Sequence, residues 1–185
     1  GLAATDVAIF EQSLWNTVHG NGLLYNSITG ASHFASHFSP ILLLLVPVYA
    51  LFQNVFVLFL FQTISICVTA LLLFKLAESV LPSEAAFFLG SAYPVHILVI
   101  DGQFTFHETF FFFVFFLLAA NSILRSRLSV FLVSSILLLT VNERSFLTVV
   151  GLVFVMMCLV YQRNKVLSWK WLGPPVIFAG LGFVA

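Results

Sequence analysis

Charged side chains are scarce in this sequence of 185 residues. Asp, Glu, Lys and Arg together make up 8% of it, hydrophobic residues make up 61%, and the mean hydropathy is +1.12. A soluble domain carries about 25% charged residues, so these charges are too few to cover the surface of even one such domain. The composition therefore excludes a water-soluble protein and predicts that lipid covers most of the chain.

The sequence also lacks an excess of either charge and has little cysteine. Seven basic and seven acidic residues give a net charge of zero, so there is no basic field to attract nucleic acid, and nucleic-acid binding is excluded. Cys67 and Cys158 lie inside apolar runs, where a small hydrophobic thiol is the usual role. A disulfide framework or a thiolate metal site is not expected.

An initiating methionine and a signal peptide are missing as well. The chain begins with Gly1, and residues 1–30 are polar and mixed where a signal peptide would show a basic end and an apolar centre. The last apolar run, Ile177 to Ala185, stops where it should continue. We therefore expect a fragment of a longer protein.

Long apolar runs are what the sequence has in abundance. A membrane-spanning helix needs about 20 mostly apolar residues to cross a hydrocarbon layer of roughly 30 Å. From residue 53 onward we predict six spans, the last incomplete: Gln53 to Glu78, Ala85 to Ile100, Thr109 to Leu124, Leu128 to Val141, Ser145 to Tyr161 and Trp171 to Ala185. The aromatic run Phe110 to Phe113 is expected to face lipid. The predicted fold is all-α, a multi-pass transmembrane helical bundle forming a single membrane domain over residues 1–185.

The segment before these spans is predicted to lie outside the bilayer, with residues 1–40 as an outer loop and residues 41–52 as an interfacial helix. Apolar residues recur at helical spacing from Asp6 to Trp15, which indicates an amphipathic helix on the membrane surface. Asp6 then either caps that helix or supplies a functional carboxylate at the lipid–water boundary. Pro40 suits the first turn of a short helix from Ile41 to Leu51.

Basic residues predict the orientation, because Lys and Arg near span ends are retained in the cytoplasm. If the spans alternate, one face receives Lys75, Arg125, Arg127, Arg163, Lys165 and Lys170. Of the basic residues, Arg144 alone falls on the other face, together with all histidines and every acid except Glu78 and Glu84. We predict an integral, multi-pass protein of a prokaryotic plasma membrane, with its N-terminal loop on the non-cytoplasmic side.

Two outer segments combine histidines with acids or hydroxyls. His33 and His37 are four residues apart, a spacing that binds a metal if the segment is helical and that fits a loop leading into the next helix equally well. In the turn from Asp101 to Glu108, solvated loop charges are one interpretation. The other is that partial burial of Glu108 against the following apolar run raises its pKa and makes proton exchange near neutral pH feasible.

A third polar segment, Asn142-Glu143-Arg144, interrupts the apolar stretch between residues 128 and 161. An ionisable side chain at bilayer depth costs roughly 2.5 to 3.5 kcal/mol. The segment is therefore either a polar hairpin at the outer surface, or it directs Glu143 into a cavity shared with the two other outer segments.

Several of these residues resemble one family. The stretch Asp6 to Gly20, with Gln12, Leu14-Trp15-Asn16-Thr17 and His19-Gly20, is followed by His37-Phe38-Ser39-Pro40 and a leucine-rich segment. Together they resemble the predicted membrane proteins of the family DUF2079, which is grouped with the GT-C glycosyltransferases. The resemblance implies a GT-C-like membrane fold, a polyprenyl-phosphate sugar donor and an active site on the outer face. It also implies that this chain is a fragment that lacks the family's first helix and C-terminal half.

The resemblance also implies that Asp6 serves as base or metal ligand. We therefore assign catalysis to Asp6 and Glu143, and substrate binding to Gln12, Trp15, His37 and Arg144. A Mg²⁺ or Mn²⁺ ion is expected on Asp6, His107 and Glu108.

Two other functions are compatible with the sequence. The chain is alternatively a non-catalytic membrane subunit that packs against other membrane proteins. It is, as a further alternative, a transporter in which Glu143 and His96 relay protons or ions. The expected partners are membrane lipids, a polyprenyl-phosphate sugar and other membrane subunits.

Overall fold

The computed structural model describes residues 2–96, 99 and 105–164, and this part of the chain is mostly helical. Its seven α-helices are α1 (Leu2–Val18), α2 (Val46–Phe52), α3 (Phe56–Ala77), α4 (Ser83–Val95), α6 (Thr109–Leu124), α7 (Leu128–Leu139) and α8 (Ser145–Asn164). Two short strands, β1 (Tyr25–Asn26) and β2 (Ala31–Ser32), pair antiparallel. Two 3₁₀ turns follow them, η1 (His33–Ala35) and η2 (Pro40–Leu44).

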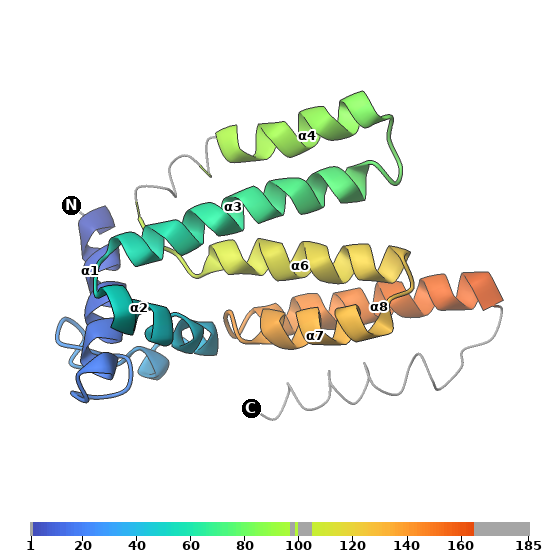
Figure 1. Ribbon diagram of the computed structural model, residues 1–185. Helices are drawn as coiled ribbons and strands as arrows, with labels where there is room; N and C mark the ends of the chain where they lie inside the picture. The colour runs from blue at the N-terminus through green and yellow to red at the C-terminus, as the bar shows by residue number, and fades with distance from the viewer. Residues whose placement is uncertain (1, 97–98, 100–104, 165–185) are drawn as a thin grey trace.

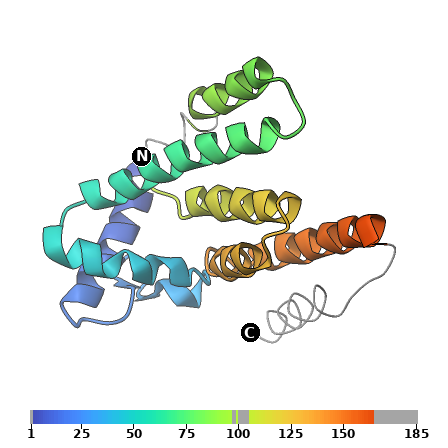
Figure 2. The same ribbon diagram turned by 45° about the vertical axis from the view of Figure 1, so that its right-hand side comes forward.

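Helices α3, α4, α6, α7 and α8 lie beside one another, and consecutive ones run in opposite directions (Figures 1 and 2). Helices α1 and α2 lie at one end of this bundle, together with η1, residues 105–108 and the α7–α8 turn; we call it the loop end. The α3–α4 and α6–α7 turns lie at the opposite end, which we call the basic end. The alternation therefore sends successive connections to opposite ends of the bundle.

The helix bounds agree closely with the predicted apolar runs. Helix α6 has the predicted bounds, α8 begins at the predicted residue, and α3 lies within its predicted span. In the described part of the chain, α3 alone is long and apolar enough to cross a membrane, with a mean hydropathy of 2.4 over its most apolar window. The predicted span Trp171 to Ala185 lies outside the described residues.

Three local predictions were wrong. Asp6 does not cap its helix, because α1 begins four residues earlier, at Leu2. The segment 41–52 is not one helix: η2 ends at Leu44, and α2 begins at Val46 with a proline in its first turn. The run Phe110 to Phe113 does not face outward as a whole, since a helix turns about 100° per residue; Phe110 and Phe111 are buried and Phe113 is exposed.

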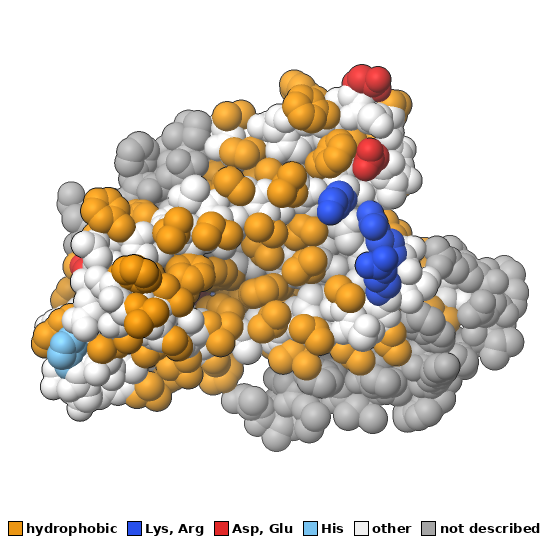
Figure 3. All heavy atoms as spheres, viewed as in Figure 1, with side chains coloured by type: hydrophobic (Ala, Val, Ile, Leu, Met, Phe, Trp, Pro, Cys, Tyr) orange, Lys and Arg blue, Asp and Glu red, His pale blue; other side chains and the backbone are white. Residues whose placement is uncertain are grey.

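The exterior of the bundle is apolar. Large exposed hydrophobic side chains occur on α3, α4, α6, α7 and α8, and they cover the middle of the face seen in Figure 3. A soluble monomer rarely exposes contiguous apolar surface on this scale. Apolar side chains therefore make up much of the exterior of the described bundle.

A hydrophobic cluster at the loop end attaches the N-terminal segment to the bundle. It joins Phe10 and Leu14 of α1 to Tyr49 of α2, Leu58 of α3 and Phe106. A second cluster packs α6, α7 and α8 together. The first cluster fixes where the segments of the loop end meet.

Helix α4 packs tightly on α3 at Gly90. A Cβ atom at this position would lie 2.9 Å from Cβ of Phe74 and 3.1 Å from the carbonyl oxygen of Ala70. Both atoms belong to, or are directly attached to, the backbone of α3, so they cannot move without moving that helix. The absence of a side chain at Gly90 therefore sets the separation of the two helices.

Replacing Gly90 by Ala is expected to lower the free energy of unfolding by about 1–3 kcal/mol, because the added methyl group overpacks the contact with α3. Thermal unfolding of the purified protein in detergent measures this. The matched control is Gly151→Ala in α8, where nothing lies within 4 Å of the added atom and a gain of up to about 1 kcal/mol is expected. Equal effects of the two substitutions would contradict the proposed contact.

Candidate functional site

A polar cavity of about 380 Å³ lies at the loop end. Segments that are far apart in the sequence line it: Asp6, Ile9 and Phe10 of α1, Asn26 and Thr29 of the β1–β2 hairpin, His33, Ser36 and His37 around η1, and His107 and Glu108 before α6. Of the predicted site residues, Asp6, His37, His107 and Glu108 thus share one cavity.

One face of α1 forms a wall of this cavity. Asp6, Ile9 and Phe10 follow the spacing of three and four residues that places side chains on the same face of a helix. The ring of Phe10 lies 5.2 Å from that of His33 and 5.0 Å from that of Phe106, measured between centroids. These contacts fix the rotation of α1, which directs Asp6 toward the cavity.

The predicted binding residues Gln12 and Trp15 do not line the cavity. The Gln12 amide donates to Ser27 Oγ at 2.8 Å and accepts from the Ser27 backbone N–H at 3.0 Å, so it clamps the β1–β2 hairpin onto α1. Trp15 is exposed and stacks on His19, with ring centroids 4.1 Å apart. In this arrangement the Gln12 amide has a structural role.

His33 is a cavity residue that the sequence analysis noted but did not assign. The 3₁₀ turn η1 brings its ring to 5.7 Å from that of His37. His33 is only 5% exposed, and its Nε2 has no hydrogen-bond partner among the described residues. Burial lowers the pKa of His33, and the neighbouring His37 lowers it further, against a smaller raising effect of Glu143. The cavity therefore contains a buried imidazole whose Nε2 has no hydrogen-bond partner among the described residues.

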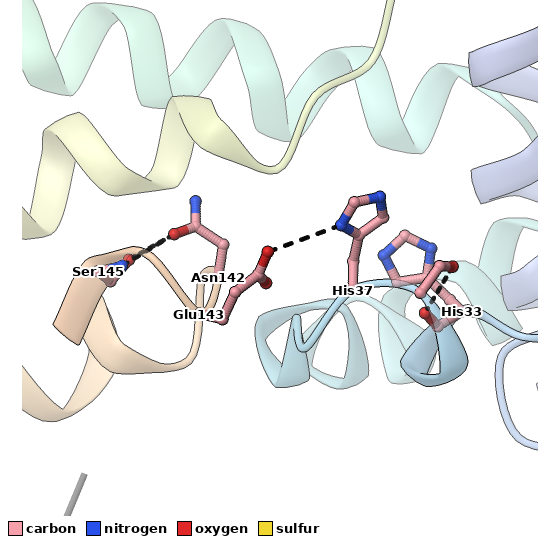
Figure 4. A network of polar contacts seen from close by, with 6 residues as sticks. His33, His37, Asn142, Glu143 and Ser145 are labelled. Carbon is pink, nitrogen blue, oxygen red and sulfur yellow. Dashed lines mark hydrogen bonds and ion pairs between the residues drawn. The ribbon is translucent and has the colours of Figure 1, made fainter. Parts of the chain in front are cut away.

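Glu143 reaches the same group of residues from the α7–α8 turn. Its carboxylate lies 3.9 Å from His37 Nδ1, and Figure 4 shows the two side chains pointing toward each other; they are 51% and 59% exposed. A hydrogen bond from its own backbone N–H is the main cause that lowers the pKa of Glu143. Desolvation opposes it, and the Phe38 backbone N–H, His37 and Arg144 lower the pKa further. Arg144 is exposed and does not line the cavity.

The neighbouring Asn142 shows why the chain turns here. Its side-chain oxygen accepts hydrogen bonds from the backbone N–H and the hydroxyl of Ser145, both at 3.0 Å (Figure 4). These bonds satisfy donors at the start of α8 in the manner of a helix cap. Asn142 thus forms the polar hairpin, one of the two alternatives posed from the sequence, and Glu143 is half exposed and is not among the residues that line the cavity.

Glu108 is the most perturbed acid of the cavity. Burial raises its pKa, while its own backbone N–H, His107 and His37 act in the opposite direction. The partial burial predicted from the apolar run after Glu108 is thus confirmed. A carboxyl group with a raised pKa is suited to exchange protons closer to neutral pH.

A buried glutamine in α3 positions His107, and the sequence analysis missed it. Gln62 is 2% exposed; its amide donates to the Thr105 carbonyl at 2.9 Å and accepts from the His107 backbone N–H at 3.1 Å. The signal was available, because an amide side chain within an apolar span is costly unless its donor and acceptor groups are paired. Gln62 holds the chain before α6 so that His107 and Glu108 face the cavity.

The proposed metal ligands share the cavity without forming a preassembled metal site. Across the described ranges, no three side chains of His, Cys, Asp or Glu come close enough to hold one ion. Asp6, His107 and Glu108 are therefore not arranged as three ligands of a single metal.

A second, more apolar cavity of about 550 Å³ adjoins the first one. It lies beside α4 and α6, and it is lined by Tyr93, His96, Val99, His107, Thr109, Phe110 and Phe113. His107 lines both cavities. A polar and an apolar compartment therefore meet at this histidine.

Replacing Glu108 by Gln is expected to remove a pH dependence of stability. Because folding raises the pKa of Glu108 above its ordinary value of 4.5, the folded state binds the proton more tightly, and the free energy of unfolding falls as the pH rises above 4.5. Thermal unfolding in detergent between about pH 4 and 8 should show this fall in the wild type and a weaker one in the variant.

Glu143→Gln is the matched control, because it should change the pH dependence of stability in the opposite direction. The pKa of Glu143 is lowered, so the wild type gains stability as the pH rises toward 4.5 and the variant lacks this gain. If Glu108→Gln has the same pH profile as the wild type, the carboxyl group is not desolvated.

Comparison with known proteins places the chain in a family. Residues 2–185 match the family described as predicted membrane protein (DUF2079). No curated protein and no solved structure matches the chain. Since the match covers nearly every residue, the chain belongs to the DUF2079 family of predicted membrane proteins.

Proposed function

We propose that the chain is part of a GT-C-like membrane glycosyltransferase, which moves a sugar from a polyprenyl-phosphate donor to an acceptor on the non-cytoplasmic face. The observation that carries this proposal is the meeting of a polar and an apolar cavity at His107. A lipid-linked sugar has the same division, because its sugar and phosphate are polar and its isoprenoid chain is apolar. The donor would bind with its head in the first cavity and part of its chain in the second.

The polar cavity has the chemistry of a sugar site. Its carboxylates accept hydrogen bonds from hydroxyl groups, and its amide, hydroxyl and imidazole groups can donate or accept. Among the described residues that line it, none is Lys or Arg. The lining therefore suits a hydroxyl-rich group better than it suits an isolated phosphate.

Asp6 would act as the base. It takes the proton of the acceptor hydroxyl while the acceptor oxygen forms a bond to the anomeric carbon of the sugar. The bond from that carbon to the phosphate oxygen breaks, and its electron pair leaves with the polyprenyl phosphate. Asp6 lies on the cavity wall formed by α1, where such a carboxylate would be accessible to both substrates.

Glu143 would contribute through His37. Its carboxylate lies 3.9 Å from His37 Nδ1, where it would orient the imidazole. His37 in the cavity wall would donate a hydrogen bond to the departing phosphate. In this proposal His37 contacts the substrate and Glu143 positions and polarises His37.

A divalent ion would fit the proposal if protein and substrate groups held it together. Mg²⁺ is commonly held by one or two carboxylates together with phosphate oxygens of the substrate. Asp6 or Glu108 would supply the protein ligand, with His107 nearby. The ion would then neutralise phosphate charge without a complete set of protein ligands.

The proposal includes a multi-pass topology. The antiparallel, apolar-surfaced helices α3, α4, α6, α7 and α8 would embed in the bilayer. The acids and histidines of the cavity lie at the loop end, whereas Lys75, Arg125 and Arg127 lie at the basic end. Retention of basic residues in the cytoplasm would place the loop end on the non-cytoplasmic side.

Single cysteines test this topology. In a background without Cys67 and Cys158, Ile28→Cys in the hairpin and Val80→Cys in the α3–α4 turn are suitable, since the native side chains are 56% and 77% exposed. A membrane-impermeant maleimide added to intact cells should label the first, and should label the second only after permeabilisation. Labelling of both from the same side would contradict the alternation.

Replacing Asp6 by Asn should reduce transfer of labelled sugar from a polyprenyl-phosphate donor by about 10²-fold or more, the usual contribution of a general base. The assay uses the full-length protein in proteoliposomes. Glu11→Gln is the matched control, because Glu11 is an acid of the same helix that lies beside the Tyr49 hydroxyl and does not line the cavity.

The outcomes separate the candidate functions. Unchanged transfer by Asp6→Asn would remove Asp6 from the mechanism. Absence of transfer by the wild type with every donor, together with purification only in stoichiometric association with other membrane proteins, would indicate a non-catalytic subunit. Uptake of a solute that depends on Glu143 would indicate a transporter.

A further inference from the structure

A third cavity lies at the basic end, far from the candidate site. Its volume is about 160 Å³, and it is lined by Leu72, Lys75, Leu118, Asn121, Ser122, Arg125, Arg127 and Val130. Three cations from α3, the end of α6 and the start of α7 thus surround one small space. Figure 3 shows the Lys and Arg side chains gathered together at this end of the molecule.

Acidic side chains lie near these cations (Figure 3) but not in the wall of the cavity. Among the described residues that line the cavity, none is Asp or Glu. Glu78 and Glu84 belong to the same end of the bundle, at the end of α3 and in the first turn of α4. Neither forms an ion pair within 4.0 Å with a described Lys or Arg. Three like charges therefore surround the cavity without a partner of opposite sign in its wall.

Helix dipoles account for two of the cations but not for the third. Lys75 lies in the last turn of α3 and Arg125 follows the last residue of α6, and cations are favoured at the negative C-terminal end of a helix. Arg127 precedes α7, where the positive end of the dipole disfavours a cation. Its position beside two other cations is explained if an anion occupies the cavity between them.

The walls of the cavity are fixed in place. The Asn121 amide donates to the Leu72 carbonyl of α3 at 3.2 Å and to the Leu117 carbonyl of its own helix at 2.9 Å. After α6, the backbone N–H of Arg127 donates to the Ser122 carbonyl at 2.9 Å. These bonds join α3 to α6 and close the turn that carries both arginines, so the three cations are held on a shared scaffold.

We propose that this cavity binds the phosphate of an anionic phospholipid from the leaflet at the basic end. Guanidinium groups bind phosphate oxygens with two parallel hydrogen bonds, and basic pockets between membrane helices on the cytoplasmic side bind anionic lipid headgroups. The volume is about five times the roughly 30 Å³ of one water molecule, which suits a phosphate group. The inference rests on the proposed membrane topology but not on the proposed glycosyl transfer.

The surroundings indicate a lipid as the source of the phosphate. Leu72, Leu118 and Val130 form the apolar part of the cavity wall. Leu71 on α3 and Val133 on α7, which are close to it along their helices, are exposed. Acyl chains attached to the bound phosphate would therefore find apolar helix surface next to the site. A free phosphate ion would leave that surface unused.

Thermal unfolding with defined lipids tests the proposal. The purified full-length protein in detergent receives phosphatidylglycerol, phosphatidylcholine or inorganic phosphate at equal concentration. Phosphatidylglycerol should raise the Tm by about 5 °C or more at saturation, and phosphatidylcholine should raise it much less. An equal shift with phosphatidylcholine would overturn the proposal, and an equal shift with inorganic phosphate would overturn the lipid as its source.

Matched variants locate the site. Arg127→Gln should lose most of the shift with phosphatidylglycerol, whereas Arg144→Gln, which makes the same change of charge at the loop end, should keep it. If Arg127→Gln does not fold, Lys75→Gln replaces it with the same expectation. If the folded variant, Arg127→Gln or Lys75→Gln, shows the same increase in Tm with phosphatidylglycerol as the wild type, the proposal is overturned. Because the readout is lipid-dependent stability, a failed glycosyltransferase assay has no bearing on it.

Discussion

The scarcity of charge constrains the rest of this structure. In an apolar environment every backbone N–H and C=O must form its hydrogen bond within the protein, which favours helices. The charged side chains and histidines then lie near the helix ends. Because α3, α4, α6, α7 and α8 alternate in direction, each connection emerges at one of two ends. The acids and histidines of one end and the cations of the other are thereby kept about one helix length apart.

At the loop end, apolar packing and a few buried hydrogen bonds assemble the candidate site together. Phe10 packs on His33 and Phe106. These contacts join α1 to η1 and to the segment before α6. Gln62 binds the backbone of Thr105 and His107. Neither Phe10 nor Gln62 is a candidate for chemistry, yet they bring together residues that are separated by about a hundred positions in the chain. The family assignment covers all of these elements.

The sequence predicted the helices well, because apolar runs bounded by polar residues leave little choice of register for α6 or of starting point for α8. It also predicted that histidines and acids share one end. It did not predict which of them meet, since that depends on how α1 is rotated: Asp6 faces the cavity, whereas Gln12 and Trp15 lie on other faces. Gln62 was missed, and His33 was noted without being assigned a role, because the importance of both comes from burial and contacts that depend on the fold.

The amide of Gln62 connects α3 to the residue that lines both cavities at the loop end. Its oxygen accepts a hydrogen bond from the backbone N–H of His107, and His107 lines both cavities. One buried side chain of α3 thereby holds in place the residue that both cavities share.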